Sequence, residues 1–275
     1  MRNITIDFIL PQEVFEKLDG VNVDTPQTLI QIFCATTDFE ELKKIQHYFS
    51  KTFPTCVLIG STTDGIIHGS KVYTDKKSIV TFTIFEQTKL KAILLEHDNV
   101  FNSSYKTGKS IAKKLIYEDT KLLINFTDGL NTNGEEYVKG ISSISSDVVL
   151  SGGLAGDNGE LSNTYVFTKS EITNNGAVGV SLSGDELTVS TNYSFDWLPV
   201  GKKLLVTKAI KNRVYEIDGM SAVSVYAKYM GQGVADRLPQ VGIEFPLIFE
   251  NHGILVGRAV LLKHDDGSLT FAGNL

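Results

Sequence analysis

The sequence predicts an α/β protein with mixed α+β character: βα units that build mixed sheets, then a β-rich meander region, then a second, partial α+β domain at the C-terminus. Three observations support this fold class. Short apolar runs alternate with stretches of helical spacing as far as the glycine-rich stretch at 150–160. Alternating runs separated by Gly-containing turns dominate after Ser162. One more helical stretch, followed by further strand-like runs, indicates a second packed region.

The first strand–helix–strand unit is expected within residues 29–60. An apolar run at 29–35 predicts a buried strand, and Asp38 is a suitable N-cap for the helix after it. The apolar residues of that helix recur at intervals of three and four: Phe39, Leu42, Ile45 and Phe49. A second apolar run at 56–60 predicts a strand parallel to the first, because such units cross over in a right-handed sense.

Residues 76–97 are predicted to form a hairpin, because apolar residues alternate there with threonines. Thr132 and Glu135 have the spacing of a capping box and mark the start of a later helix. Four elements are expected after the hairpin, in the order helix, strand, helix, strand: 103–119, 121–127, 132–145 and 147–153. Both of these strands are expected to be buried.

The part of the chain after Ser162 is rich in predicted strands. They are expected at 164–168, 176–184, 186–193, 203–212 and 213–218. Gly184-Asp185 and Asp266-Gly267 each predict a hairpin turn. A helix is expected between Asp218 as its cap and Gly231 as its end. The last run is expected to be an unpartnered edge strand, which suggests that the natural protein continues.

Composition argues against several classes of function. The chain has 275 residues and a net charge of −6, and its acidic and basic residues are interspersed, so we expect no nucleic-acid partner. No apolar run approaches the roughly 20 residues that span a bilayer, and the start lacks a signal peptide, so we expect a cytoplasmic protein without a membrane segment. Cys34 and Cys56 are expected at opposite ends of neighbouring strands, as buried residues too far apart for a disulfide.

The sequence does not match the known cofactor-binding and catalytic motifs with which it was compared. Gly108-Lys109-Ser110 resembles the end of a phosphate-binding loop, but Ser103 stands where its first glycine is required. The glycines of "SGGLAGD" have the wrong spacing for a dinucleotide fold, and a strand pattern follows them. We expect no cofactor and no metal, and the histidines are expected at the surface or at element ends: His47, His68, His97, His252 and His264.

Three predicted strands end in polar, Gly-containing turns, at 60–65, 125–134 and 151–158. If these strands are parallel, the turns converge at one edge and can line a pocket for a small zwitterion or polar metabolite. Gly152 and Gly153 would offer main-chain N–H groups to a carboxylate. The other candidate ligand-binding residues in these turns are Thr62, Thr63, Asp64, Asp128, Asp157 and Asn158. The same residue types also serve in turns that bind nothing.

Several ordered segments resemble FIST domains: "FPTCVLIGSTTDGII", "LLINFTDGL", "VVLSGGLAGDN" and "DWLPVGKKLLVTKAIKNRVYEIDGMSA". The resemblance implies an N-terminal segment at 1–25, an N-terminal FIST domain at 26–221 and the start of a C-terminal FIST domain at 222–275. It also implies a bacterial sensory module that binds small ligands such as amino acids. Kinase, chemotaxis-type or diguanylate cyclase output domains beyond this chain are its implied partners, and a homo-oligomer is compatible with that role.

The first turn departs from the pattern of the family. Ser61 stands where the family often has Cys, and Ile66 stands where it often has Glu. This difference suggests a ligand different from that of relatives. Arg258, from the expected second domain, is a candidate clamp for a carboxylate. Trp197 is expected in the core, with the wall of the pocket as the alternative.

Three functions remain open at this level. The first is a non-enzymatic sensor whose Asp128 or Asp157 meets the ammonium group of a ligand. The second is a hydrolase or transferase that uses a Ser or Thr of the same turns, such as Ser151 or Thr62, beside a base. The third is a protein-interaction module without a small ligand, which an exposed apolar patch without a cavity would favour.

Overall fold

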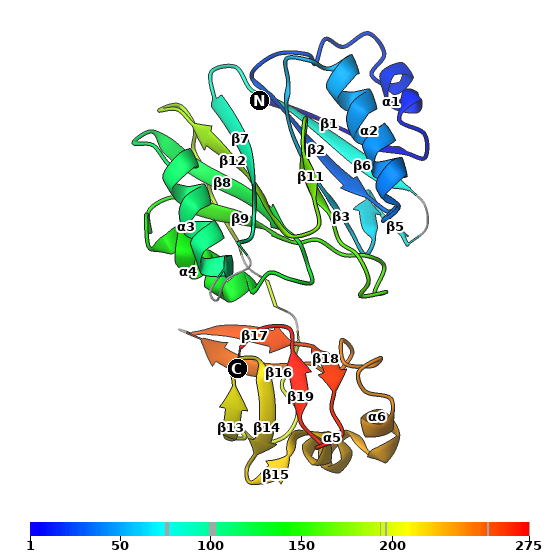
Figure 1. The fold of residues 1–275 in the computed structure, drawn as a ribbon, viewed down its shortest axis with the longest axis vertical. Helices are drawn as coiled ribbons and strands as arrows, with labels where there is room; N and C mark the ends of the chain where they lie inside the picture. The colour runs from blue at the N-terminus through cyan, green and yellow to red at the C-terminus, as the bar shows by residue number, and fades with distance from the viewer. Residues whose placement is uncertain (75–76, 99–102, 193, 196, 252, 275) are drawn as a thin grey trace. The chain divides into compact units, whose positions relative to one another are not determined.

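The computed structural model describes residues 1–74, 77–98, 103–192, 194–195, 197–251 and 253–274. These residues form two compact units, Met1–Ser190 and Thr191–Leu275, which we call unit 1 and unit 2 (Figure 1). The mixed α+β class predicted from the sequence is confirmed. The expected segment 1–25 belongs to unit 1, and the expected boundary after Ser221 falls inside unit 2.

Unit 1 contains a six-stranded mixed sheet, the first sheet. Its strands are, in spatial order, β1 (Arg2–Phe8), β6 (Ser78–Ile84), β2 (Thr28–Cys34), β3 (Val57–Thr62), β10 (Val166–Thr168) and β11 (Ile172–Thr173). As predicted, β2 and β3 are parallel, whereas the other pairs are antiparallel. Helices α1 (Gln12–Lys17) and α2 (Phe39–Thr52) contribute to the apolar core on its outer face.

A four-stranded second sheet completes unit 1. It contains β7 (Lys89–Glu96), β12 (Gly176–Ser183), β8 (Thr120–Thr127) and β9 (Val149–Leu154), in that order, and β8 and β9 are parallel. Helices α3 (Ser103–Leu115) and α4 (Gly134–Ser142) cover its outer face. The inner faces of the two sheets pack together, so unit 1 has the layers helix, sheet, sheet, helix (Figure 1).

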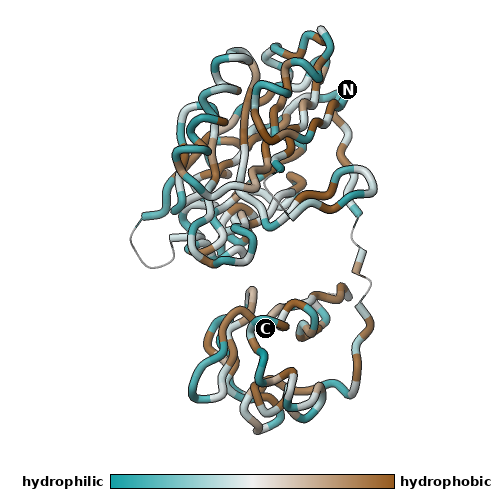
Figure 2. Tube along the Cα trace, turned by 90° about the vertical axis from the view of Figure 1, so that its right-hand side faces the viewer, coloured by the Kyte–Doolittle hydropathy of each residue, from teal (hydrophilic) through white to brown (hydrophobic). Residues whose placement is uncertain are grey.

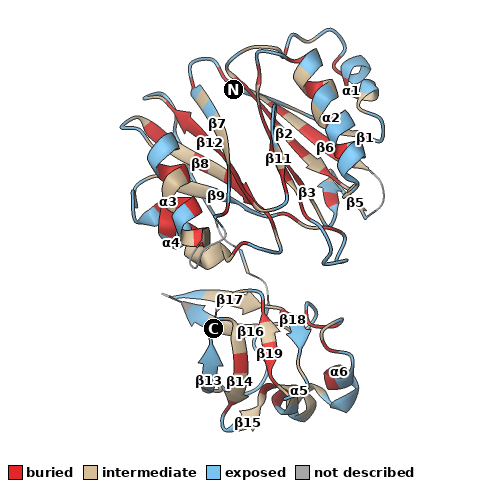
Figure 3. Cartoon of the chain, in the orientation of Figure 1, coloured by how far each residue is buried: buried red, intermediate tan, exposed pale blue. Residues whose placement is uncertain are grey.

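Apolar side chains fill all three interfaces between these layers. Residues of α2 and the first sheet form one cluster, and α3, α4 and the second sheet form another. The cluster between the sheets includes Leu29, Ile59, Phe126 and Val178. Hydrophobic residues accordingly run through the strands of unit 1 (Figure 2). Helices α2 and α3 each have a buried side and an exposed side (Figure 3), as their helical spacing predicted.

Capping explains where the helices of unit 1 begin. The Asp38 side chain accepts a hydrogen bond from the Glu41 N–H at 2.8 Å, which confirms the predicted N-cap of α2. Helix α4 begins one residue later than predicted, because Asn133 and not Thr132 caps it, accepting from the Glu136 N–H at 3.1 Å. The Thr132 hydroxyl donates instead to Asp128 at 2.7 Å. The Thr132 side chain therefore points to the buried carboxylate and does not accept the main-chain N–H that an N-cap would bind.

Gly108, which the phosphate-loop comparison singled out, has a packing role inside α3. A Cβ at Gly108 would overlap the main-chain oxygen of Tyr137 in α4, and a Cβ at Gly140 would overlap that of Tyr105 in α3. The two helices therefore touch backbone to backbone, which only glycine allows at these positions. This contact holds α3 and α4 together as one layer on the second sheet.

Two predicted hairpins do not form. Strands β6 and β7 lie in different sheets, because β6 pairs with β1 and β2, whereas Phe85 enters the core between the sheets and leads the chain to β7. After Gly184, residues 186–192 form no strand, and Tyr193 lies outside the described residues. The chain leaves unit 1 there, so β12 pairs with β7 and β8 instead.

Strand β9 was predicted to be buried, but it is the edge of the second sheet, and its last four residues are exposed. The strand-rich sequence after Ser162 supplies β10 and β11 to the first sheet and β12 to the second. A small hairpin, β4 (Ile66–His68) with β5 (Lys71–Tyr73), follows β3. Cys34 and Cys56 are both free and buried, as expected, and burial raises the pKa of each thiol to about 12.

Unit 2 is a smaller α+β body with its own core. Its main sheet has the order β13 (Val206–Ile210), β14 (Arg213–Ile217), β19 (Leu269–Phe271) and β18 (Val260–Lys263), with β15 (Met220–Ser221) beside β14. Helices α5 (Ala222–Met230) and α6 (Gln232–Asp236) contribute to that core, and β16 (Leu247–Asn251) pairs with β17 (Ile254–Arg258).

Of four expectations for unit 2, two are confirmed and two are wrong. The turn at Asp266-Gly267 joins β18 and β19 as predicted, and Gly231 ends α5 as predicted. The cap of α5 is Ser221 and not Asp218, whose side chain accepts from the Leu205 N–H. The expected edge strand β19 lies between β14 and β18, where both of its edges are paired.

The contact between α3 and α4 gives a testable prediction. We expect Gly140→Ala to lower the free energy of unfolding by about 2 kcal/mol, because the new methyl group forces the helices apart. The matched control is Gly233→Ala in α6, where a Cβ meets nothing within 4 Å, so this change should be neutral or slightly stabilising. Urea unfolding followed by circular dichroism measures both, and equal stability of the two variants would contradict the close packing.

Candidate functional site

The carboxyl ends of four strands of unit 1 surround a cavity of about 500 Å³ between the two sheets. Strands β2 and β3 form one wall, and β8 and β9 form the other. The lining residues are Gln31, Phe33, Ser61, Thr62, Thr63, Ile124, Phe126, Ser151, Gly152, Gly153 and Leu154. The predicted convergence of strand ends therefore occurs across two packed sheets and not along the edge of one sheet.

Strand alternation explains why polar groups reach this cavity. Leu29 and Phe33 face the second sheet, so Gln31 between them faces it as well. On β3, Ile59 lies in the apolar core between the sheets, and Ser61 is the next residue on the same face. On β9, Ser151 lies opposite Ile124 of β8. The layer between the sheets is thus apolar over most of its length and polar at the carboxyl ends of the strands.

The side chains of Gln31, Ser61 and Ser151 make no hydrogen bond with another described residue. Ser61 as a whole is only 3% exposed, but its hydroxyl oxygen is not one of the buried side-chain atoms that lack a partner, so it is open to the cavity. The two other hydroxyls of the lining are engaged: Thr62 accepts from the Tyr165 N–H, and Thr63 donates to the Gly65 carbonyl. Gln31, Ser61 and Ser151 are therefore the side-chain groups of the cavity that can bind a ligand.

Aromatic rings close the apolar side of the cavity. Phe33 of the first sheet and Phe126 of the second meet edge to face, with ring centroids 5.2 Å apart and an angle of 72° between the rings. Such a pair stabilises the contact between the sheets beyond simple burial of area. Both rings also line the cavity, next to its polar end.

The absence of a side chain has a different structural consequence at each glycine of "SGGLAGD". Gly152 has a φ of 130°, and a Cβ there would overlap the Asn125 main chain of β8. Gly153 has no heavy atom within 4 Å of a built Cβ, so its missing side chain leaves open space in the cavity. A Cβ at Gly156 would overlap the Asp64 carboxylate. The motif therefore combines close backbone packing with room for a ligand.

Asp64 joins the first and third predicted turns. One carboxylate oxygen accepts from the Asp157 N–H at 2.8 Å and from the Gly159 N–H at 3.2 Å. The Gly156 N–H also donates to the Thr62 carbonyl at 3.1 Å. Asp64 itself is exposed, so its charge remains hydrated while it fixes the turn beside the cavity. Nearby, the Asn158 side chain donates to the Ala35 carbonyl at 3.2 Å.

Asp157 is buried and organises its own turn. Its two oxygens accept from the main-chain N–H groups of Leu161 at 3.0 Å, Ser162 at 2.6 Å and Asn163 at 3.1 Å. These bonds fix the main chain of the turn, whose residues 161–163 are themselves exposed. The carboxylate does not line the cavity. Asp157 therefore does not reach the cavity, where the sequence suggested that it meets the ammonium group of a ligand.

Asp128 lies in a second buried network, away from the cavity lining. Its carboxylate is fully buried and accepts from the N–H groups of Leu130, Asn131 and Gly176 and from the Thr132 hydroxyl. Burial alone would raise the pKa of Asp128, but hydrogen bonds from His97, Thr132 and Asn131 outweigh it and hold the pKa below its usual value. The charge of Asp128 thus stabilises the second predicted turn, at 125–134.

His97 is the partner that the sequence did not identify. It was expected at the surface or as a capping residue, but it is only 7% exposed. Its Nε2 lies 2.6 Å from the Thr132 hydroxyl and 3.3 Å from Asp128, and its Nδ1 lies 2.8 Å from the Thr107 hydroxyl. Because Thr132 donates its proton to Asp128, its oxygen accepts from Nε2. In the sequence, the only indication of this buried role is that His97 is a polar residue directly after the strand β7.

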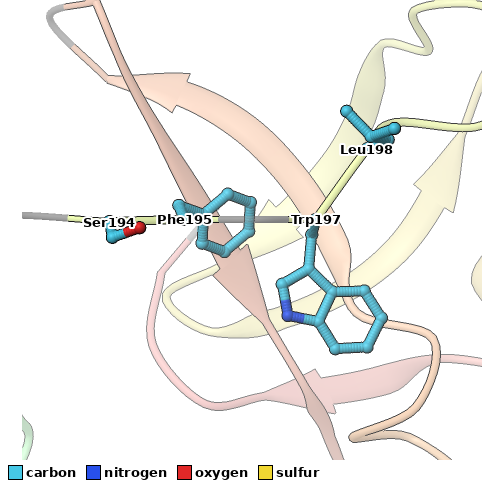
Figure 4. Close-up of a pocket in the computed structure, with 4 residues that line it drawn as sticks. All are labelled: Ser194, Phe195, Trp197 and Leu198. Atoms are coloured by element: carbon cyan, nitrogen blue, oxygen red, sulfur yellow. The ribbon is translucent and has the colours of Figure 1, made fainter.

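Two further candidates lie in unit 2. Arg258 of β17 donates from Nε to the Asn274 carbonyl at 3.2 Å, and its guanidinium lies 5.3 Å from the centre of the Phe249 ring. Its role as a carboxylate clamp stays a prediction. Trp197 is 46% exposed and not in the core; with Ser194, Phe195 and Leu198 it lines a separate hollow of about 620 Å³ (Figure 4).

The remaining candidate groups are placed as follows. Ile66, at the position where the resemblance suggested a Glu in relatives, is 3% exposed and lies as a buried apolar residue in the β4–β5 hairpin. His68 of the same hairpin lies 3.3 Å from Asp7. His252 lies outside the described residues.

The part of the chain that the structure describes contains no group of three or more His, Cys, Asp or Glu side chains that could hold a metal ion. Nor do the described helices include one long and apolar enough to cross a membrane.

The buried network around Asp128 gives a prediction with a defined pH dependence. Asp128→Asn should lower the free energy of unfolding by about 3 kcal/mol at pH 7, because an amide donor then faces groups that themselves donate. The pKa of Asp128 is lowered by folding, so the advantage of the wild type is complete above the unfolded value of about 3.9. It disappears as the pH falls through the lower folded value.

Urea unfolding between pH 7 and pH 2 measures this difference. The control is Asp185→Asn, since Asp185 is exposed in the turn after β12 and should change stability by less than about 0.5 kcal/mol. A deficit of Asp128→Asn that stays constant down to pH 2 would show that the charge of the carboxylate is not the cause.

One known protein family matches most of this chain. The profile of the FIST N domain matches residues 28–220, which include β2, β3, β8 and β9 and therefore both walls of the cavity. A comparison with curated proteins finds no match. The matched range covers most of the chain and contains the segments that carried the resemblance, apart from the last two residues of the fourth segment. The chain therefore belongs to the FIST family, a family of sensor-type domains of signal transduction.

Proposed function

We propose that this chain is a non-catalytic sensor domain that binds a small polar metabolite in the cavity between the two sheets of unit 1. One observation carries the proposal: Gln31, Ser61 and Ser151 present polar groups without protein partners at one end of an otherwise apolar layer. Unpaired polar groups in such a layer cost free energy unless water or a ligand satisfies them. Ser61 is also a position at which the chain departs from the family pattern, which suits a ligand-selecting role.

The hydroxyl groups of the cavity support a non-catalytic role. A serine or threonine nucleophile needs a base within hydrogen-bond reach. Among the described residues, neither Ser61 nor Ser151 forms a side-chain hydrogen bond with a base. His97 is engaged by Thr107 and Thr132, and His68 lies beside Asp7. A hydrolase or transferase therefore receives less support than a binding domain.

The edge position of β9 suggests how binding is reported. β9 pairs with β8 only, and Ser151 and Gly153 lie on its exposed half. A ligand that bridges these residues to β3 would restrain β9 and the turn after it. In a cytoplasmic signalling protein, that change could be read by an output domain, such as the kinase, chemotaxis-type or diguanylate cyclase domains that the resemblance implies, or by a second copy.

Thermal unfolding in the presence of a metabolite library, with amino acids as one class, tests this proposal. A ligand at 100 times its Kd should stabilise the chain by about 2.7 kcal/mol. Gly153→Leu should remove this stabilisation, because the new side chain fills open space in the cavity and its backbone φ accepts a side chain. The matched control Gly233→Leu places the same side chain in open space in α6 and should keep the full effect.

Two outcomes would contradict the proposal. The first is that no member of a chemically broad library stabilises the wild type. The second is a stabilisation that Gly153→Leu leaves unchanged, since the ligand would then bind elsewhere.

A further inference from the structure

The walls of the cavity carry polar groups but no formal charge. Among its described lining residues, the side-chain hydrogen-bonding groups are the amide of Gln31 and the hydroxyls of serines and threonines. A charged ligand group loses its hydration on entry, and without an oppositely charged partner that loss is not recovered. The chemistry of the lining therefore favours an uncharged ligand.

The carboxylates nearest in sequence do not supply the missing charge. Asp157 is buried and accepts from three successive main-chain N–H groups of its own turn. Asp128 is fully buried within the network of His97 and Thr132. Asp64 is exposed, and one of its oxygens accepts from two N–H groups. The first two are committed to the protein, and the third is hydrated at the surface.

The shape of the lining adds a second requirement. Phe33 and Phe126 line the cavity with aromatic rings from both sheets, and Ile124 adds an apolar side chain. Beside Phe126 in the second sheet, Gly153 leaves open space. Aromatic rings favour a planar body that can stack or meet an edge. The hollow is open to solvent along the exposed half of β9, and its volume of about 500 Å³ is in the size range of sites for small organic ligands.

The free polar groups define the third requirement. The Gln31 amide can donate and accept at the same time, and so can the hydroxyls of Ser61 and Ser151. A ligand with an adjacent donor and acceptor, as in a carboxamide or a lactam, can satisfy these groups in pairs. A zwitterion would instead need one cationic and one anionic partner.

We propose that the cavity takes an uncharged, planar ligand with an amide-type donor and acceptor, which sets it apart from the amino acids that the family resemblance implied. This inference rests on the proposed function, because it assigns a ligand class to the same cavity. It uses the lining residues alone: Phe33 and Phe126 for the planar body, and Gln31, Ser61 and Ser151 for the polar group.

Three fragments with the same ring separate charge from shape: benzamide, benzoate and benzylammonium. Titration of each into the ¹⁵N-labelled full chain at pH 7, followed by amide chemical shifts, gives three dissociation constants. We expect benzamide to bind at least tenfold more tightly than either charged fragment. Gly153→Leu should abolish the benzamide shifts, and Gly233→Leu should preserve them. Gln31→Leu should weaken benzamide at least tenfold, because it removes the amide and keeps similar bulk.

The outcomes distinguish this inference from the proposed function. Tighter binding of benzoate or benzylammonium, lost in Gly153→Leu, would overturn the uncharged ligand class and leave the cavity as a ligand site. Benzamide shifts that Gly153→Leu does not change would overturn this inference, because the fragment would bind elsewhere. Failure of all three fragments would overturn it as well, and a library ligand sensitive to Gly153→Leu would then still support the proposed function.

Discussion

The packing of two sheets face to face is the constraint on which unit 1 depends. Each inner face must be apolar where the other sheet covers it, and the buried cluster around Leu29, Ile59, Val178 and Val180 meets that requirement. Polar side chains on the same faces are tolerated only where water or a ligand can reach them. Gln31, Ser61 and Ser151 occupy such positions, at the carboxyl ends of their strands. The cavity is therefore the place where the rule of apolar packing is relaxed.

Three carboxylates, two buried and one exposed, hold the turns that follow β3, β8 and β9. Asp64, Asp128 and Asp157 each accept main-chain N–H groups of irregular segments that cannot satisfy them by regular pairing. The same residues attracted attention in the sequence because Asp near Gly also marks ligand-binding turns. In this fold their charges shape the turns, and the neutral groups on the strands face the cavity. A rigid frame with an uncharged interior suits selective binding of a neutral molecule.

Local signals in the sequence predicted much of the fold. The helical spacing of Phe39, Leu42, Ile45 and Phe49 and the cap at Asp38 identified α2, and the strand–helix–strand order identified the parallel pair β2–β3. The pairing of β6 with β1 could not be predicted in this way, because a strand pattern does not specify its partner. The same limit applies to β9, whose apolar start gave no sign that it forms an edge.

The position of the cavity was predicted in part. A cavity at the ends of β3 and β9, lined by Gly152 and Gly153, was expected from the sequence, whereas the presence of Gln31 in its lining was not. In the sequence, Gln31 is a polar residue within an apolar strand. Such a residue is recognised as facing inward only when the sheet that covers the strand is known. Conversely, Asp128 and Asp157 were candidate ligand-binding residues because they lie in polar turns, and only the three-dimensional structure shows that their oxygens are already engaged.

The stability of the double variant Gln31→Leu, Ser61→Ala tests most directly whether these groups serve a ligand or the fold. Groups retained for binding do not contribute to folding, so the variant should unfold in urea at the same or a higher free energy than the wild type, by up to about 2 kcal/mol. The measurement needs no knowledge of the ligand. A loss of more than about 2 kcal/mol would contradict the account, because it would show that both side chains are structural.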